Sequence, residues 1–234
     1  HFAPHTPIEP DERFAQAYRD RGYSEAEAAY ASLIAGVDKS TGDLLALLDE
    51  LGVAGNTLVV FTSDNGGVSH QYRDGEPHTH NRPLSSGKGS HHEGGIRVPL
   101  LVRQAGLVPA QAVNSTPVMI QDWFPTLLKH AGIHEDTIPS NDGLNLAPLL
   151  RGDPAPVAFR RPLFWHFPHL WGPLQNDGPV EGPGLGPCSA VRLGDWKLIY
   201  YHADLSFELF HLGSDLGERR NLVESYPDTA AHLA

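Results

Sequence analysis

The sequence predicts an α/β fold: part of a mainly parallel central sheet, followed by a small antiparallel sheet with a helix. Two observations from the first half and one from the end support it. A helical pattern over residues 24–51 leads into a short apolar run, Thr57–Thr62. Near the end of the chain, three short runs of strand-forming residues are separated by turn residues. Alternation of helix and strand is typical of α/β domains, and closely spaced strands are typical of antiparallel sheets.

The first element is a helix over residues 24–51, where apolar residues recur at spacings of three and four and Gly52 follows the last turn. A loop at 53–56 leads into Thr57–Thr62, whose length and valine content favour a buried parallel strand. We expect a second buried strand at Val98–Arg103. A helix is predicted at Ile120–Ala131, ending at Gly132.

Three regions follow from these patterns. Residues 1–150 are predicted to belong to the α/β domain, and residues 151–187 to form an ordered loop rich in glycine and proline. Residues 188–234 are predicted to form the small antiparallel sheet. There, a hairpin turns at Gly194-Asp195, Phe207–Leu212 adds a third strand, and a helix near Pro227–Leu233 closes the unit.

The amino-acid composition excludes or disfavours several classes of protein. The chain has 234 residues, 40% of them hydrophobic, which is enough for a sizeable core. Its formal net charge of −11 disfavours general binding to nucleic acids or anionic membranes, since both need a basic face. One cysteine, Cys188, excludes an internal disulfide framework, and no apolar run is long enough to span a membrane. The chain starts at His1 in what resembles the tail of a strand, so we expect an interior starting point.

The strand at Thr57–Thr62 ends in Ser63-Asp64-Asn65-Gly66-Gly67. Ligands of open α/β sheets bind beyond the carboxyl ends of strands, which is where these residues fall. A carboxylate beside an amide carbonyl supplies two hard oxygen ligands, suited to Ca²⁺ or Mg²⁺. The alternative is an ordinary turn, because Asp-Asn-Gly-Gly is also typical turn chemistry.

Taken together, the segments of the chain resemble the C-terminal portion of type I sulfatases. These are the arylsulfatase-like, formylglycine-dependent enzymes of the alkaline phosphatase superfamily. The resemblance spans nearly the whole chain, and the segments occur in family order. They are His5-Thr6-Pro7, NTLVVFTSDNGG, GKGSHHEGGIRVPLLV, QDWFPTLL, DGLNLAPLLRG, SAVRLGDWKLIYY and ELFHLGSDLGERRNL. The implied fold is part of an alkaline-phosphatase-like sandwich.

The resemblance also implies roles for four residues. Asp64 and Asn65 match a pair of metal ligands, normally for calcium and less often for magnesium. Lys88 matches a lysine that contacts the sulfate and its bridging oxygen, and His5 matches a histidine beside the leaving group. These roles are chemically sound, because the transition state places negative charge on the departing oxygen, where a cation or proton donor lowers the barrier. Taken alone, His5 is equally compatible with a loop histidine that caps a turn, and Lys88 with a surface lysine.

Further expectations concern neighbouring residues. Glu93 and Arg97 are interpreted as scaffold, forming a tight turn with an ion pair or backbone contact. In the segment Trp165–Trp171, His166 and His169 are candidate substrate-binding residues beside aromatic rings that can stack on sugars or aryl groups. Core packing explains the aromatic residues of that segment equally well.

The nucleophile is not expected in this chain. The family derives its formylglycine from the cysteine of a Cys-x-Pro-Ser-Arg motif, whereas Cys188 is followed by Ser-Ala-Val-Arg in the predicted hairpin. The resemblance implies that the true motif and the remaining metal ligands lie upstream of His1. We therefore expect about half an active site here, inactive alone and completed by an N-terminal part of the same enzyme.

The predicted function is a sulfuric ester hydrolase that removes sulfate from a sulfated glycan or an aryl sulfate. Two alternatives stay open: a phosphomonoester or phosphonate monoester hydrolase of the same superfamily, and an inactive, truncated sulfatase remnant. By resemblance, the expected location is periplasmic, secreted or lysosomal.

Overall fold

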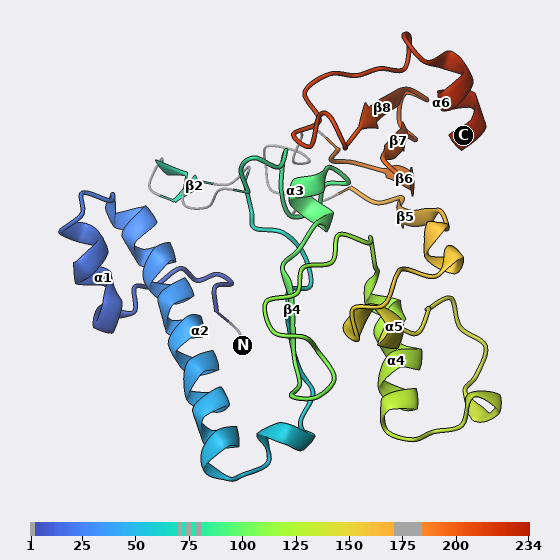
Figure 1. The fold of residues 1–234 in the computed structure, drawn as a ribbon. Helices are drawn as coiled ribbons and strands as arrows, with labels where there is room; N and C mark the ends of the chain where they lie inside the picture. Colours follow the sequence, from blue (N-terminus) through green and yellow to red (C-terminus); the bar gives the residue numbers. More distant parts are fainter. Residues whose placement is uncertain (1–2, 70–71, 74–75, 78–80, 171–183) are drawn as a thin grey trace.

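A computed structural model describes residues 3–69, 72–73, 76–77, 81–170 and 184–234 of the chain (Figure 1). Its α-helices are α1 (Glu12–Arg19), α2 (Glu25–Glu50), α3 (Glu93–Ile96), α4 (Trp123–His130), α5 (Ala147–Leu150) and α6 (Pro227–Leu233). Its 3-10 helices are η1 (Ala54–Asn56), η2 (Ile120–Asp122), η3 (Glu135–Thr137) and η4 (Val157–Arg160). Its strands are β1 (Val59–Thr62), β2 (Tyr72–Arg73), β3 (Glu76–Pro77), β4 (Leu100–Arg103), β5 (Leu163–Phe167), β6 (Cys188–Leu193), β7 (Trp196–Tyr201) and β8 (Phe207–His211).

The long helix α2 confirms the predicted helix over residues 24–51. Ser24 caps it by accepting a hydrogen bond from the Glu27 amide, and Gly52 follows its end with a positive φ of 68°. Helix α1, which the sequence analysis did not predict, packs against α2. Three leucines at or just after the last turns of α2 are exposed. They are Leu44, Leu47 and Leu51.

The strands β1 and β4 confirm the two strands predicted in the first half, but their orientation and burial differ from the prediction. They pair antiparallel, with Val59 opposite Arg103 and Thr62 opposite Leu100. The prediction of a buried parallel strand was therefore wrong, because among the described residues β1 pairs antiparallel with β4. The residues between the two strands reverse the chain direction, so β4 returns alongside β1. Only one face of this ribbon is covered, and Leu101 on the other is exposed.

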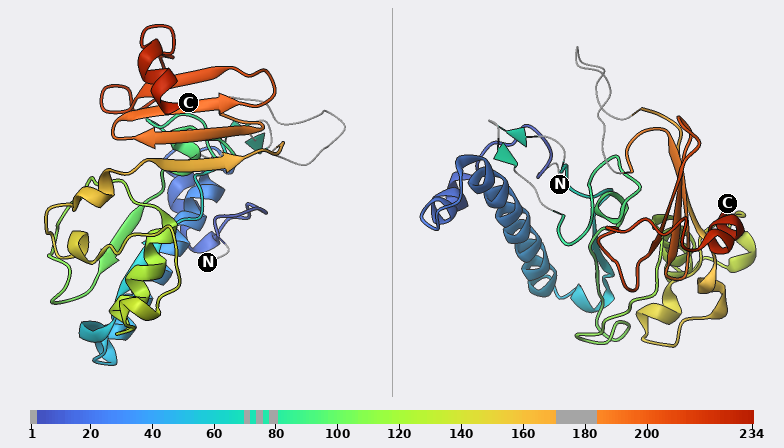
Figure 2. Two further views of the ribbon diagram at one scale, coloured as in Figure 1. Left: turned by 90° about the vertical axis from the view of Figure 1, so that its right-hand side faces the viewer. Right: turned by 90° about the horizontal axis from the view of Figure 1, so that it is seen from above.

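The core on the covered face of the β1–β4 ribbon is a buried cluster of Trp123 from α4, Leu146 from just before α5 and Phe159 from η4. Val60 and Val102 of the ribbon pack against this cluster. The predicted helix Ile120–Ala131 is confirmed as η2 followed by α4, and Gly132 ends it with a φ of 82°. Figures 1 and 2 show α2 on the opposite side of the ribbon from α4.

The C-terminal sheet has the strand order β5-β6-β7-β8, with every neighbouring pair antiparallel (Figure 2). The predicted hairpin, third strand and last helix are confirmed, and α6 covers one face of the sheet through Ala230. The other face carries a second buried cluster that includes Cys188, Ile199 and Phe210.

Strand β5 corrects the predicted loop over residues 151–187, because that region also contains a strand and the 3-10 helix η4. β5 forms by pairing with β6, with Leu163 opposite Arg192 and Phe167 opposite Cys188. That partner follows the Gly/Pro-rich segment in sequence and is not visible in the local pattern. Residues 171–183 of the predicted loop lie outside the described residues. Among the described helices, none is long and apolar enough to cross a membrane.

Candidate active site

The turn that follows β1 is held by its own side chains. The Asn65 amide donates a hydrogen bond to Asp64 Oδ1 over 3.0 Å, and the Asn65 side-chain nitrogen donates to the Gly66 carbonyl over 2.8 Å. Ser63 Oγ donates to the Asn65 carbonyl over 2.9 Å. The Asp64 side chain is exposed and Asn65 is half-buried. With its nitrogen engaged internally, Asn65 has its side-chain oxygen left as the group that can bind a cation.

Backbone hydrogen bonds connect this turn to residues 85–97, which carry Lys88 and include α3. We call residues 85–97 the Lys88 loop. The Lys88 amide donates to the Gly67 carbonyl over 3.0 Å, and the Gly66 amide donates to the Gly95 carbonyl over 2.9 Å. Asn81 connects the same two segments, since its side chain accepts from the Gly67 amide and donates to the carbonyls of Gly67 and Ser86. The structure therefore brings Asp64 and Asn65 together with the Lys88 loop.

Two glycines allow this close approach. A Cβ atom on Gly66 would lie 1.7 Å from the Gly94 carbonyl oxygen, and one on Gly87 would lie 2.2 Å from the Gly67 carbonyl oxygen. Both distances are far shorter than a carbon–oxygen contact allows, and both neighbours are backbone atoms that cannot move aside easily. Glycine at these positions is needed to pack the turn against the loop.

Lys88 itself is half-buried, and its ammonium forms no ion pair with any residue that the structure describes. Its backbone is fixed at Gly67, and no carboxylate among the described residues pairs with its charge, which is a suitable arrangement for contact with an anion. His5 is exposed, and its Nδ1 lies 3.0 Å from the Thr6 carbonyl oxygen. The hydrogen bonds described for His5 are to the neighbouring Thr6.

The Lys88 loop is anchored to the C-terminal sheet by a buried ion cluster, which we call the Lys197 cluster: Lys197, Glu93 and Glu218. Lys197 on β7 is fully buried, and its Nζ lies 3.0 Å from Glu93 Oε1 and 2.7 Å from Glu218 Oε1. Glu218 also accepts a hydrogen bond from the Glu93 amide over 2.6 Å. Arg97 lies 3.3 Å from Glu93, which confirms the scaffold role predicted for Glu93 and Arg97.

A second set of polar contacts fixes His92 of the same loop. His92 Nε2 lies 3.1 Å from Glu208 Oε2 on β8, and its Nδ1 lies 3.0 Å from Ser85 Oγ. The Tyr201 hydroxyl donates to the same Glu208 oxygen. Burial alone would raise the pKa of Glu208, but the hydrogen bonds from His92 and Tyr201 outweigh it and leave the pKa below its usual value. Burial, together with the bond to Glu208, raises the pKa of Tyr201.

Cys188 lies in this interior and not at the turn. Its Sγ is 2.9 Å from His91 Nδ1, and burial raises the pKa of the thiol to about 11. Burial, with a smaller effect of the Lys197 charge, lowers the pKa of His91 to about 4. The pair therefore exists as a neutral thiol and a neutral imidazole at physiological pH. A thiol of this kind is a poor nucleophile.

The candidate substrate residues make their described contacts at the C-terminal sheet and next to it. His166 on β5 places its Nδ1 2.7 Å from Ser189 Oγ, which also lies 2.9 Å from His202 Nε2. His169 is exposed, with its ring against Phe167 at 5.5 Å between centroids. Within the described part of the chain, neither histidine makes a polar contact with the turn or with the Lys88 loop. Their role in substrate binding stays a prediction.

The turn fits part of a calcium site. Asp64 and Asn65 together offer carboxylate and amide oxygens, the ligand types that Ca²⁺ takes, but Ca²⁺ needs six to eight oxygen ligands. No group of three or more histidine, cysteine, aspartate or glutamate side chains suited to a metal occurs among the described residues. Asp64 and Asn65 can therefore supply some of the ligands of a hard cation, and further ligands must come from elsewhere.

Sequence comparison shows two matching families. The sulfatase family profile matches residues 2–133, and that of the N-sulphoglucosamine sulphohydrolase C-terminal family matches residues 87–233. A sulfatase from Formosa agariphila is 34% identical over 217 residues, which cover 86% of this chain and 36% of that protein. Human N-acetylgalactosamine-6-sulfatase is 34% identical over 209 residues, which cover 81% of this chain and 38% of that protein.

Comparison with solved structures agrees with the sequence comparison. A crystal structure of Ps i-CgsB in complex with k-i-k-neocarrahexaose matches with a TM-score of 0.76 and 27% identity, covering 99% of this chain and 46% of that one. The fold thus belongs to the alkaline-phosphatase-like class of α/β enzymes, as predicted. Within that class, the chain belongs to the sulfatase family. It spans less than half the length of these relatives.

Proposed function

We propose that the protein containing this chain is a sulfuric ester hydrolase and that the chain supplies part of its active site. One observation carries the proposal: the Asp64-Asn65 turn and the Lys88 loop are held together by direct backbone hydrogen bonds and by Asn81. Membership of the sulfatase family supports the assignment of sulfate as the group transferred.

Each predicted site residue has a proposed role in the cleavage of the sulfate ester. Cleavage of a sulfate ester places negative charge on the oxygen that leaves, and the uncompensated ammonium of Lys88 stabilises that charge. His5 donates a proton to the same oxygen, acting as a general acid. Asp64 and Asn65 would hold a calcium ion, in preference to magnesium, and the ion would supply positive charge at the sulfate.

The nucleophile is proposed to come from outside these 234 residues. The sequence contains no Cys-x-Pro-Ser-Arg motif, and Cys188 is buried with a raised pKa. In this proposal the hydrate of a formylglycine, formed on another part of the same protein, would supply the nucleophilic hydroxyl group. The 234 residues alone are then expected to bind substrate weakly and not to turn it over.

The proposed substrate is a sulfated glycan. One relative acts, by its name, on N-acetylgalactosamine-6-sulfate groups, and the structural relative was solved with a neocarrahexaose. A glycan substrate favours an exported or lysosomal location, where such polymers occur. His166 and His169 are retained as candidate residues for the sugar.

The decisive experiment compares ester classes on the full-length protein. We expect turnover of 4-nitrophenyl sulfate and release of sulfate from a sulfated galactosamine, with a kcat/KM for the sulfate at least ~10-fold above that for 4-nitrophenyl phosphate or a phenylphosphonate ester. Preference for the phosphate or phosphonate would instead assign the protein to a phosphoester hydrolase. No turnover of any ester by the full-length, calcium-loaded protein would identify it as an inactive remnant.

A further inference from the structure

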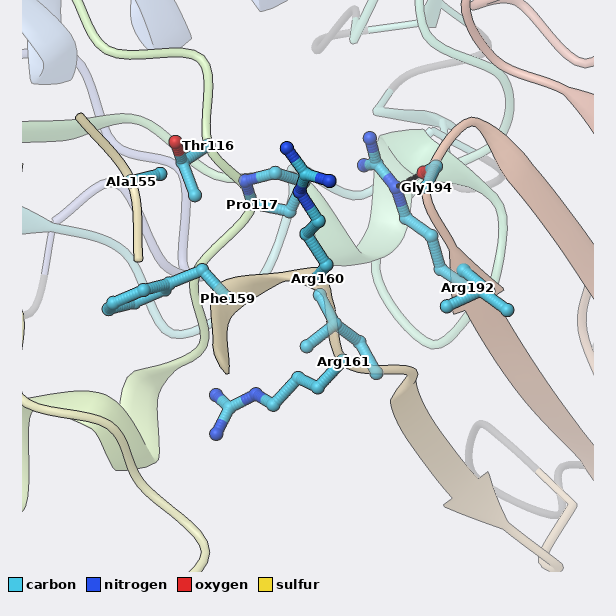
Figure 3. Close-up of a pocket in the computed structure, with 10 residues that line it drawn as sticks. Thr116, Pro117, Ala155, Phe159, Arg160, Arg161, Arg192 and Gly194 are labelled. Carbon is cyan, nitrogen blue, oxygen red and sulfur yellow. Dashed lines mark hydrogen bonds between the residues drawn. The ribbon is translucent and has the colours of Figure 1, made fainter. Parts of the chain in front are cut away.

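A pocket of about 480 Å³ lies at the junction of η4, the start of β5 and the turn between β6 and β7, and none of its described lining residues belongs to the Asp64-Asn65 turn or to the Lys88 loop (Figure 3). Its volume is within the range of small-molecule sites. Three arginines line it although the chain as a whole carries a net charge of −11. Its other lining residues are mainly apolar and include Pro117, Phe159 and Leu163.

The three arginines differ in how far they are neutralised. Arg161 is engaged with Asp122 and with the Asp142 carbonyl, and Figure 3 shows it pointing away from the other two. Arg160 is exposed and forms no ion pair or hydrogen bond with any described residue. The guanidinium groups of Arg160 and Arg192 lie at the same end of the pocket (Figure 3).

Arg192 is oriented but only partly compensated. Its Nε donates to the Gly194 carbonyl over 3.0 Å, which fixes the guanidinium, and its Nη1 lies 3.8 Å from Glu93 Oε2. Glu93 is closer to Lys197 and to Arg97 than to Arg192. Its negative charge is therefore shared among three cations, and this end of the pocket keeps an excess of positive charge.

We propose that this pocket binds a tetrahedral oxyanion ester, a sulfate or phosphate group carried on a ring. Two guanidinium groups from different elements approach the anion from different directions. A tetrahedral group offers three oxygens to accept from both, and charge-assisted hydrogen bonds of this type are strong. Pro117, Phe159 and Leu163 supply apolar contact for the ring. This binding site is separate from the proposed reaction and does not require turnover.

The test is titration calorimetry on the protein carrying all 234 residues, together with ¹⁵N spectra of the arginine Nε–H groups. The ligands are phenyl sulfate, phenyl phosphate, phenol and inorganic sulfate. We expect phenyl sulfate or phenyl phosphate to bind at least ~10-fold more tightly than phenol and to shift the Nε–H signals of Arg160 and Arg192. The stronger of the two esters identifies the source of the anion. Equal affinity for inorganic sulfate and the phenyl esters would contradict the role of the apolar wall and overturn the proposal.

Three variants locate the binding. Arg160→Gln should weaken it by ~10-fold, and since Arg160 is exposed and unpaired in the described structure, the fold should be unaffected. Arg220→Gln is the matched control, an exposed arginine outside the pocket, and should leave the affinity unchanged. Loss of binding in Lys88→Gln with no effect of Arg160→Gln would place the anion in the active site and refute the proposal.

Discussion

Replacing Lys197 by methionine tests the idea that a buried ion cluster holds the Lys88 loop on the C-terminal sheet. Lys197 is fully buried between Glu93 and Glu218, whose side chains are also almost completely buried. Methionine fills most of the same volume but leaves both carboxylates without their central cation. Only Arg97, which is half-exposed, and Arg192 at 3.8 Å remain near Glu93.

The expected cost follows from that geometry. Breaking a buried ion pair by removing one partner costs about 3–5 kcal/mol, because a buried charge is left uncompensated. For a chain of this size, such a loss lowers the Tm by roughly 10 °C. The assay is urea and thermal unfolding followed by circular dichroism, on the wild type and on Lys197→Met.

The matched control is Lys39→Met on α2. Lys39 also pairs with a carboxylate, Asp43, at 2.6 Å, but both side chains are more than half exposed. Pairs of this kind contribute about 0.3–0.5 kcal/mol, so the control should unfold almost like the wild type. If Lys197→Met and Lys39→Met cost the same, the reasoning that burial makes the Lys197 cluster essential is refuted.

Three further predictions address the cysteine, the buried histidine and the metal turn. Because burial raises the pKa of Cys188 to about 11, its alkylation by iodoacetamide at pH 8 should be about 100-fold slower in the native protein than in urea; equal rates would contradict its burial. The pKa of His91 is lowered from 6.5 to about 4 by burial, so the unfolded chain takes up a proton between these values that the native chain does not. The free energy of unfolding should therefore fall by up to about 3 kcal/mol from pH 6.5 to 4, and His91→Gln should flatten this slope, whereas an unchanged slope would exclude His91 as its source. Calcium at about 100 times its Kd should stabilise the full-length protein by about 2.7 kcal/mol; Asp64→Ala should remove most of that effect, and an unaltered calcium response would remove Asp64 from the set of ligands.

Local patterns predicted much of the fold. The helix α2, the hairpin of β6 and β7, and the helix α6 all depend on neighbouring residues: spaced apolar positions, the Gly194-Asp195 turn and a closing glycine or proline. Strand direction depends on a distant partner. The first strand was therefore wrongly predicted to be parallel, and β5 was missed because its partner lies beyond a long Gly/Pro-rich segment.

In the candidate site too, local motifs could be predicted from the sequence, whereas contacts between distant residues could not. The resemblance to sulfatases indicated Asp64, Asn65 and Lys88. In the structure, hydrogen bonds join the turn of Asp64 and Asn65 to the Lys88 loop. The bonding of Asn81 to Gly67 was not predicted, because nothing in the sequence context of Asn81 indicates it. Glu93 was correctly assigned to the scaffold, but its buried partner Lys197 is 104 residues away and could not be identified from spacing.

The most direct test of the central proposal is the sulfatase kcat/KM of full-length Lys88→Gln, measured beside the wild type. Lys88 is proposed to stabilise charge that develops only in the transition state, so kcat/KM should fall by ~100-fold or more while the Tm stays unchanged. Arg220→Gln serves as the control for loss of a surface cation. A Lys88→Gln protein that retains kcat/KM within twofold of the wild type would contradict the assignment of the turn and the Lys88 loop as part of the active site.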